Sequence, residues 1–198
     1  MSEIQKSILA SGSTEELRGY EGKAAVAYFH VLNELILQQK DVFQFSSRNK
    51  RPPEDAVNAM MSFAYTLLAH DCAAALESVG LDSYVGFLHK DRPGRTSLAL
   101  DLEEELRPAV ADRMVLTLIN NREITEKHFL YQSDGAVLLN DSGRKIFLKK
   151  WQEKKKEMLT HPYLKEKVTW GLIPYVQALL LARHIRTDLE EYPPFLWK

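Results

Sequence analysis

The sequence predicts a mainly α-helical protein, organised as a multi-helix domain with short extended segments. Apolar residues recur at intervals of three and four over long stretches, which is the period of an amphipathic helix. Residues that start and stop helices stand at the ends of these stretches. The chain has 198 residues, of which 45% are hydrophobic, enough for one substantial core. We therefore expect one helical domain over residues 13–198, preceded by a linker or disordered segment at residues 1–12.

The first two helices are marked by their ends. Ser13 is followed three residues later by a glutamate, a pattern typical of a capping box, and apolar residues carry this helix to about Gln39. Pro53 suits the first turn of a second helix, and Gly80 is expected to end it. The single cysteine, Cys72, follows the apolar spacing of the second helix, which predicts a core position.

The segment at residues 81–100 is too interrupted by glycine and proline for a long helix, and it predicts two brief extended pieces around a loop. The second of these pieces is Leu98–Leu100. A helix should resume near Asp101 and continue to about Asn120, with a kink or break at Pro108.

Residues 121–188 predict a small hairpin and two further helices. Apolar runs on either side of Ser133-Asp134-Gly135 indicate a hairpin near residues 129–139. A lysine-rich helix is expected from residue 140 or 141 to about Met158. A final helix should run from about Lys165 to Asp188, before a tail that contains two prolines.

Overall charge and composition exclude several classes of protein. The net charge is −1 with a pI near 6.6, so any contact with DNA must be local. The longest unbroken apolar stretch, at residues 178–182, is far shorter than a membrane span, and the polar N-terminal segment lacks the apolar core of a secretory signal. One cysteine excludes an internal disulfide and a multi-cysteine zinc site. We expect a soluble, cytoplasmic protein with no membrane partner.

The candidate catalytic residues gather at residues 84–108, where a histidine, basic residues and carboxylates lie between apolar segments. His89 ends one apolar segment, and Asp101 and Glu104 stand three apart at the expected start of a helix. Helical carboxylates with this spacing can offer two oxygens to a divalent ion from one face. A hydrogen-bonded structural histidine is the alternative for His89. Acidic residues that complement the helix dipole explain Glu103 and Glu105 better than metal binding does.

Basic residues surround this acidic cluster. Arg92, Arg95 and Arg107 are candidate contacts for the phosphates of DNA, although they could simply balance the acidic charges. The lysine run at residues 149–156 is typical of a solvated helix face.

Glu21 is the third candidate ligand. It lies on or beside the apolar stripe of the first helix, and Gly19 and Gly22 beside it indicate close approach by another backbone or a ligand. A solvated glutamate at the stripe's edge is the alternative, and periodicity alone favours it. The pair His70-Asp71 lacks the further histidines that a phosphohydrolase dyad requires, and we attribute it to the polar side of the second helix.

Four segments together resemble the CRISPR-associated endonuclease-integrase family that captures new spacers. The resemblance runs in order through nearly the whole chain, in RGYEGKAAVAYF (18–29), RPPEDAVNAMMSFAYTLLAHD (51–71), GLDSYVGFLHKDRPGRTSLALDLEEELRP (80–108) and DRMVLTLIN (112–120). The closing YPPFLWK is similar to subtype C of the type I systems.

The resemblance implies a mostly helical C-terminal catalytic domain that binds Mg2+ or Mn2+. The family's metal ligands match Glu21, His89 and Glu104, and Asp101 matches an aspartate that assists them. Many relatives have aspartate in place of Glu104, a change that keeps the same oxygen chemistry.

The implied substrate is double-stranded and branched DNA, which the enzyme cleaves or joins by transesterification. The implied partners are a small ferredoxin-like CRISPR-associated adaptation protein and a second copy of the full-length chain. Family members begin with a β-rich domain that this sequence lacks, so we expect the chain to correspond to their C-terminal part.

Two other functions remain open from the residues themselves. The first is a non-catalytic helical interaction module, in which the acidic cluster caps helices. The second is a generic metal-dependent phosphohydrolase, which would turn over nucleotides instead of branched DNA.

Overall fold

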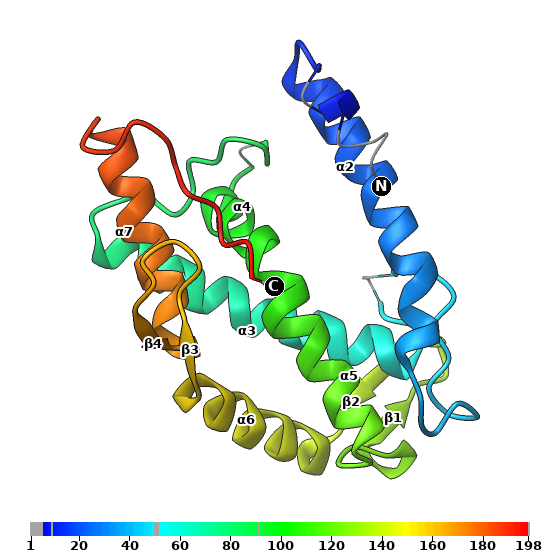
Figure 1. Cartoon of the computed structure of the whole chain (residues 1–198). Coiled ribbons are helices and arrows are strands. Elements are labelled where there is room, and N and C mark those ends of the chain that lie inside the picture. Colours follow the sequence, from blue (N-terminus) through cyan, green and yellow to red (C-terminus); the bar gives the residue numbers. More distant parts are fainter. Residues whose placement is uncertain (1–5, 9, 50–51, 91, 198) are drawn as a thin grey trace. The chain divides into compact units, whose positions relative to one another are not determined.

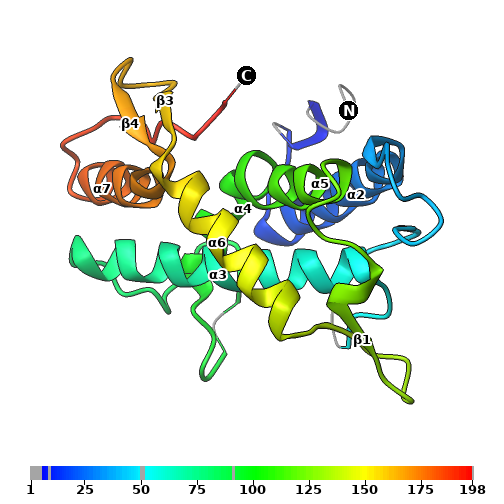
Figure 2. The same cartoon turned by 90° about the horizontal axis from the view of Figure 1, so that it is seen from below.

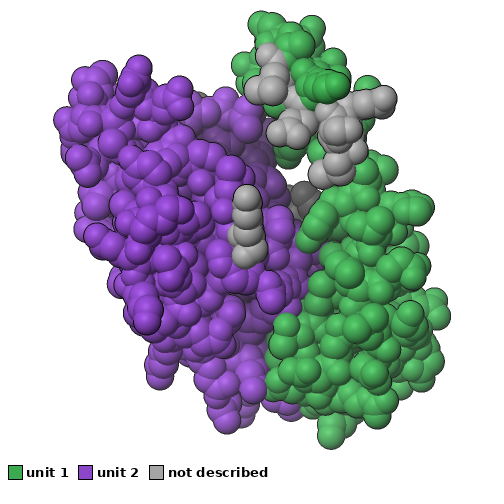
Figure 3. Space-filling model, viewed as in Figure 1, with its two compact units in different colours: residues 1–60, 116–140 green, residues 61–115, 141–198 purple. Residues whose placement is uncertain are grey.

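The computed structural model confirms a mainly α-helical chain, and its described residues contain two small antiparallel hairpins, one of which the sequence predicted (Figure 1). The structure describes residues 6–8, 10–49, 52–90 and 92–197. Half of the predicted linker at residues 1–12, namely residues 1–5 and 9, lies outside the described residues, while residues 6–8 are helical. The chain forms two compact units, residues 1–60 with 116–140 and residues 61–115 with 141–198 (Figure 3).

Unit 1 begins with helix α2 (Thr14–Leu32), which starts where the capping box predicts. The Ser13 hydroxyl accepts the Glu16 N–H at 3.2 Å, and Glu16 in turn accepts the Gly12 N–H at 2.9 Å. Leu32 is the helix's buried residue, so most of α2 lies open to solvent within the described chain.

Helix α2 ends seven residues before the predicted end at Gln39 and passes into the short 3-10 helix η1 (Asn33–Leu35). The cause is a side chain distant in sequence. Asn120 accepts the N–H groups of Leu37 at 2.7 Å and Gln38 at 3.2 Å, and it donates to the Leu35 carbonyl at 2.9 Å. These bonds hold the chain in a turn that helical periodicity does not reveal.

The predicted hairpin near residues 129–139 is confirmed by strands β1 (Phe129–Tyr131) and β2 (Val137–Leu139). The strands are antiparallel, with Phe129 opposite Leu139 and Tyr131 opposite Val137. Gly135 has a φ of 87°, which its lack of a Cβ permits in the turn. The short 3-10 helix η3 (Glu126–His128) leads into β1.

Helix α3 (Ala56–Ser78) contributes residues to both units and starts later than Pro53 predicted. Its cap is Asp55, whose side chain accepts the Asn58 N–H at 2.7 Å. The predicted stop is confirmed, because Gly80 has a φ of 82° and the next N–H, of Leu81, closes back on the Leu76 carbonyl. By length and composition α3 could cross a membrane, but half of its apolar window is buried within the chain.

Helix α4 (Ser97–Leu106) contradicts the expected extended piece at Leu98–Leu100. The carbonyl of Ser83 accepts the N–H groups of Leu98 and Ala99 at 3.0 and 3.3 Å, so two donors of the first helical turn are satisfied by a distant residue. The helix therefore starts four residues before Asp101.

Pro108 breaks the α-helical ladder as predicted, because proline donates no N–H. The chain continues as the π-helix η2 (Arg107–Asp112) and then as helix α5 (Arg113–Asn120), which contributes residues to both units.

The rest of unit 2 contains a hairpin that the sequence did not predict. Helix α6 (Asp141–Lys156) is followed by strands β3 (Met158–Thr160) and β4 (Lys167–Thr169), which pair antiparallel. The short 3-10 helix η4 (Trp170–Leu172) then leads into helix α7 (Ile173–Ile185), which stands beside the hairpin (Figures 1 and 2). The final helix therefore starts eight residues later than Lys165.

Candidate active site

Asp101 organises the loop that carries His89. Its carboxylate accepts the backbone N–H groups of three successive loop residues, Phe87 at 2.6 Å, Leu88 at 3.1 Å and His89 at 3.0 Å. Asp101 lies on α4, within the first two turns, so the loop is fastened to a helix that is itself buried on its other side. The position of His89 is therefore set by Asp101.

The loop passes close to α4 at Gly86. A Cβ at this position would lie 2.7 Å from the Ser97 Cβ, 2.8 Å from the His89 carbonyl oxygen and 3.0 Å from Asp101 Oδ2. Only glycine allows the backbone to approach the helix this closely.

The His89 ring is oriented by the same carboxylate. Its Nδ1 lies 2.7 Å from Asp101 Oδ1, and burial of Asp101, which raises its pKa, is outweighed by hydrogen bonds from His89 and the loop that lower this pKa below its usual value. An ionised Asp101 requires a proton on Nδ1, which leaves the Nε2 lone pair of a neutral ring available. Nε2 lies 3.9 Å from Glu104 Oε1. A nitrogen donor and a carboxylate oxygen thus stand next to each other, and both side chains are partly exposed.

Glu103 is a buried ion-pair partner, and its interpretation as a first-turn dipole residue is wrong. The helix begins at Ser97, so Glu103 is not in its first turn. Its side chain is 0% exposed and accepts Arg107 Nε at 2.9 Å. Desolvation raises the pKa of Glu103, and the hydrogen bond from Arg107 opposes that rise. Among the described residues its second oxygen has no hydrogen-bond partner.

Glu105 binds the C-terminal tail, so the dipole interpretation is wrong for this residue as well. One carboxylate oxygen accepts the Tyr192 hydroxyl and the Gln177 amide, the latter at 3.1 Å. The other accepts the Phe195 N–H at 2.8 Å. Burial raises the pKa of Glu105, and these bonds oppose the rise.

Glu21 lies on α2 in unit 1, whereas His89, Asp101 and Glu104 lie in unit 2. The structure therefore brings three of the four predicted residues together and leaves the role of Glu21 as a prediction. Glu21 is exposed. No described atom of the rest of the chain lies within 4 Å of a Cβ built on Gly19 or Gly22, so the predicted close approach by the backbone is not found.

The three arginines differ in their surroundings. Arg92 is exposed and Arg95 is half-buried on the loop that follows His89. Arg107 is 17% exposed and donates to both Glu103 and Glu104. Its guanidinium also lies over the Tyr65 ring, 4.7 Å from the centroid. These contacts favour a structural role for Arg107, while its predicted phosphate contact stays a prediction.

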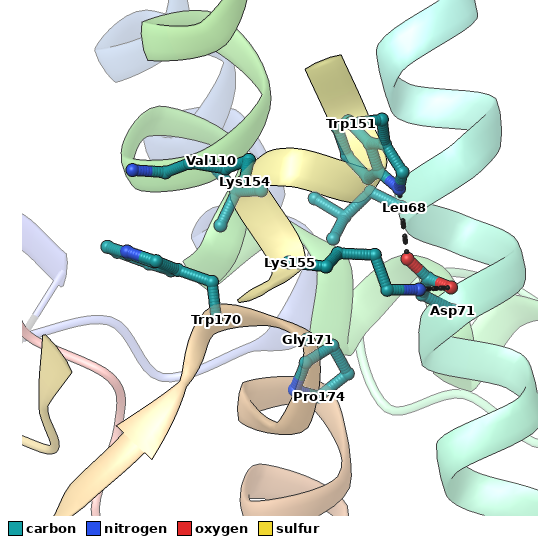
Figure 4. A pocket seen from close by; sticks show the side chains of 9 residues that line it. All are labelled: Leu68, Asp71, Val110, Trp151, Lys154, Lys155, Trp170, Gly171 and Pro174. Atoms are coloured by element: carbon teal, nitrogen blue, oxygen red, sulfur yellow. Dashed lines mark hydrogen bonds and ion pairs between the residues drawn. The ribbon is translucent and has the colours of Figure 1, made fainter. Parts of the chain in front are cut away.

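A second polar cluster of unit 2 lines a small pocket between α3, α6 and η4 (Figure 4). Asp71 accepts Lys155 Nζ at 2.6 Å and Trp151 Nε1 at 3.2 Å. Lys154 stands 4.9 Å from the Trp170 ring centroid. Lys154 and Lys155 of the lysine run therefore contact side chains of unit 2. Asp71, predicted to belong to the polar side of its helix, instead links α3 to α6.

Within the described ranges no group of three or more histidine, cysteine or acidic side chains forms a metal site. The local arrangement is instead a pair, His89 and Glu104, braced by Asp101 and Arg107. Sequence reasoning found the pair and named Asp101 as an assisting residue, but it missed the ion pairs that Arg107 makes with Glu103 and Glu104. The signal in the sequence was the spacing of Glu103, Glu104 and Arg107, which places ion-pair partners three and four residues apart on one helix.

The chain is thus a mainly helical protein in which His89 lies between the carboxylates of Asp101 and Glu104. Residues 1–153 match the sequence profile of the family described as CRISPR associated protein Cas1. The chain belongs to this family.

Individual relatives agree with this result. A CRISPR-associated endonuclease Cas1 from Rhodospirillum rubrum is 53% identical over 199 residues, covering 100% of this chain and 58% of the relative. A solved casposase bound to integration product has a TM-score of 0.88 at 26% identity and covers 99% of this chain and 58% of that one. A solved Cas1 protein from Thermotoga maritima has a TM-score of 0.82 at 30% identity, over 93% of this chain and 56% of that one. The chain thus spans rather more than half the length of these relatives.

Proposed function

We propose that this chain carries metal-dependent DNA endonuclease and integrase chemistry, which inserts new spacers into a CRISPR array. One observation carries the proposal. His89 Nδ1 is bound to Asp101 at 2.7 Å, and Nε2 lies 3.9 Å from Glu104 Oε1. A metal-binding histidine commonly donates the N–H of its other ring nitrogen to a carboxylate, as Nδ1 of His89 does to Asp101. Glu104 adds a carboxylate oxygen on the Nε2 side of the ring. The casposase and Cas1 relatives support the same chemistry.

The donor set suits Mg2+ or Mn2+. Glu104 offers carboxylate oxygen, which both ions prefer, and His89 adds an imidazole nitrogen, which Mn2+ accepts readily. Glu21 is the proposed third ligand. When bound, the ion would polarise a phosphodiester oxygen and neutralise the charge that develops there.

The protein's own residues would position the reactants. Asp101 holds the proton on Nδ1 of His89 and fixes the orientation of the ring, so that Nε2 is the nitrogen that would bind the ion. Arg92 and Arg95 follow on the same loop and would hold the phosphates of a DNA backbone near the acidic pair. A DNA 3′-hydroxyl, or water in the nuclease reaction, would then attack phosphorus, and the bond from phosphorus to one strand oxygen would break, releasing that strand end with a free hydroxyl. Attack by the DNA hydroxyl is a transesterification, and attack by water is a hydrolysis.

Exposed aromatic side chains on the same loop support a DNA substrate. Tyr84 and Phe87 are 49% and 62% exposed and lie within five residues of His89. Aromatic faces stack on unpaired bases, and neighbouring cations attract the backbone. The loop thus presents an aromatic surface for unpaired bases and positive charge for the DNA backbone.

The remaining features of the proposal come from the family. We propose that the full-length protein works as a homodimer with a small ferredoxin-like CRISPR-associated partner, in the cytoplasm, and that it is of subtype C. We also propose that residues 13–198 form the C-terminal catalytic domain.

Titration of the chain with Mn2+ in a calorimeter tests the site. We expect His89→Ala and Glu104→Ala each to weaken Mn2+ binding by roughly two orders of magnitude, since each removes one ligand. Glu21→Ala tests the third ligand in the same way. His70→Ala, which changes an exposed histidine of α3, is the matched control and should leave Mn2+ binding intact.

The same variants separate the three functions. An integrase domain should cleave branched DNA with Mn2+ and lose this activity in His89→Ala, while the unfolding midpoint stays unchanged. If the wild-type chain does not bind Mn2+ at all, a helical interaction module becomes the better explanation. Turnover of free nucleotides without cleavage of DNA would indicate a generic phosphohydrolase.

A further inference from the structure

Arg107 is surrounded by partners from three directions. Its Nε donates to Glu103 Oε1 at 2.9 Å, and Nη1 donates to Glu104 Oε1. One face of the guanidinium covers the Tyr65 ring at 4.7 Å from the centroid, and the Tyr65 hydroxyl is bound to Asp112 Oδ1 at 2.6 Å. A guanidinium fixed on both an edge and a face has little freedom to turn.

The charges of this cluster argue against a phosphate contact by Arg107. One guanidinium faces the two carboxylates of Glu103 and Glu104, so the local sum is negative. Glu103 is fully buried, and removal of its ionic partner would leave an uncompensated charge in the interior. Arg107 therefore cannot move toward DNA without a large loss of stability.

The oxygen of Glu104 that Arg107 holds is the one that faces His89. Glu104 Oε1 accepts Arg107 Nη1 and lies 3.9 Å from His89 Nε2. Glu104 is 32% exposed, and a glutamate at such a position would otherwise sample several rotamers. The bond to Arg107 selects the rotamer that points toward the imidazole.

We propose that Arg107 is a positioning residue, which holds the Glu104 carboxylate opposite His89 Nε2 and is itself braced by buried Glu103 and by Tyr65. The inference rests on the proposed function, since the consequence of a misplaced Glu104 is weaker binding of the metal ion. It assigns Arg107 a role different from that of Arg92 and Arg95. Asp101 positions the histidine, and Arg107 positions the carboxylate.

Arg107→Lys tests the proposal because it keeps the charge that Glu103 needs and loses the planar fork that binds two carboxylates. We expect Mn2+ to bind the variant chain about 10-fold to 100-fold more weakly, the usual effect of losing a residue that orients a ligand. Affinity for branched DNA without metal should stay unchanged. Arg92→Gln is the comparison variant, for which we expect weaker DNA binding and unaltered Mn2+ binding.

The opposite pattern overturns the proposal: weaker metal-free DNA binding by Arg107→Lys with wild-type Mn2+ affinity would make Arg107 a phosphate contact. Where Arg107→Lys does not fold, Tyr65→Leu takes its place, because it removes the ring over which the Arg107 guanidinium lies, 4.7 Å from its centroid, and should also weaken Mn2+ binding. Unchanged Mn2+ affinity in that variant equally overturns the proposal. Glu104→Ala separates the failure of the proposed function from the failure of this inference. If Glu104→Ala leaves Mn2+ binding intact, the proposed metal site is wrong. If Glu104→Ala abolishes Mn2+ binding but Arg107→Lys does not weaken Mn2+ binding, only the role of Arg107 is wrong.

Discussion

At the scale of single residues, His89 owes its orientation to the close approach at Gly86 and to the carboxylate of Asp101. The sequence pointed to His89, Asp101 and Glu104 through their residue types and the family resemblance. It could not show that Asp101 accepts three backbone N–H groups, because that depends on how the loop folds back onto α4. The prediction that Glu103 lies in the first helical turn was wrong, because the helix starts at Ser97, and that start depends on the distant Ser83 carbonyl.

Gly86→Ala should disturb this arrangement strongly. The new Cβ would lie under 3.0 Å from the Ser97 Cβ and from the His89 carbonyl oxygen, so the loop must move away from Asp101. We expect a loss of about 1–3 kcal/mol in the free energy of unfolding, as for other overpacked sites, together with weaker Mn2+ binding. Urea unfolding and Mn2+ titration measure the two effects.

Gly19→Ala is the matched control for this substitution. Its Cβ would meet open space inside α2, and replacing a helical glycine should stabilise the chain by up to about 1 kcal/mol. Equal behaviour of the two alanine variants would contradict the close approach at Gly86.

At the scale of elements, the C-terminal tail packs against the body of unit 2. Phe195 is 3% exposed and meets the rings of His161 and Trp170 edge-on, with centroid distances of 5.6 and 5.9 Å. Its N–H is bound by Glu105, the residue after Glu104, so the tail is fixed to the helix that carries the candidate ligand. The final helix ends at Ile185, three residues before the predicted end at Asp188, and nothing local in the sequence predicts where an extended tail docks.

Phe195→Ala should therefore destabilise unit 2. Removing a buried phenylalanine ring costs about 3–5 kcal/mol in other proteins, and we expect a value near the lower limit because the tail is a single extended segment. The neighbouring Leu196 is 71% exposed, and Leu196→Ala should change stability by less than about 0.5 kcal/mol. Urea unfolding of both variants measures the difference, and similar losses would show that the tail does not dock as described.

At the scale of the whole molecule, helical content, the hairpin at residues 129–139 and the break at Pro108 follow from local patterns. The second hairpin, β3 with β4, did not, because the chain between its strands has no glycine turn like the one at Ser133-Asp134-Gly135. Its loop is held instead by His161, a buried side chain whose partners come from the loop and from α7.

The buried His161 makes stability depend on pH. Its Nδ1 accepts the N–H groups of Tyr163 and Leu164, both at 3.2 Å, and its Nε2 lies 3.0 Å from Gln177 Oε1, so the ring must be neutral with the proton on Nε2. Burial lowers the pKa of His161 below the ordinary value of 6.5, although the bond to Gln177 opposes the shift. In the unfolded chain His161 therefore takes up a proton near pH 6.5, whereas in the folded chain it is protonated only at a lower pH.

Between these two pKa values the free energy of unfolding should fall as the pH falls, by at most about 1.4 kcal/mol per pH unit for this one group. Below the pKa of the folded state both forms carry the proton, and the loss stops growing. Urea unfolding from pH 8 to pH 5 measures the slope, and His161→Asn should flatten it, because the asparagine oxygen can still accept the loop N–H groups but does not titrate. The same measurement at pH 8 gives the cost of the substitution itself, and an equally steep slope in the variant would assign the pH dependence to other groups.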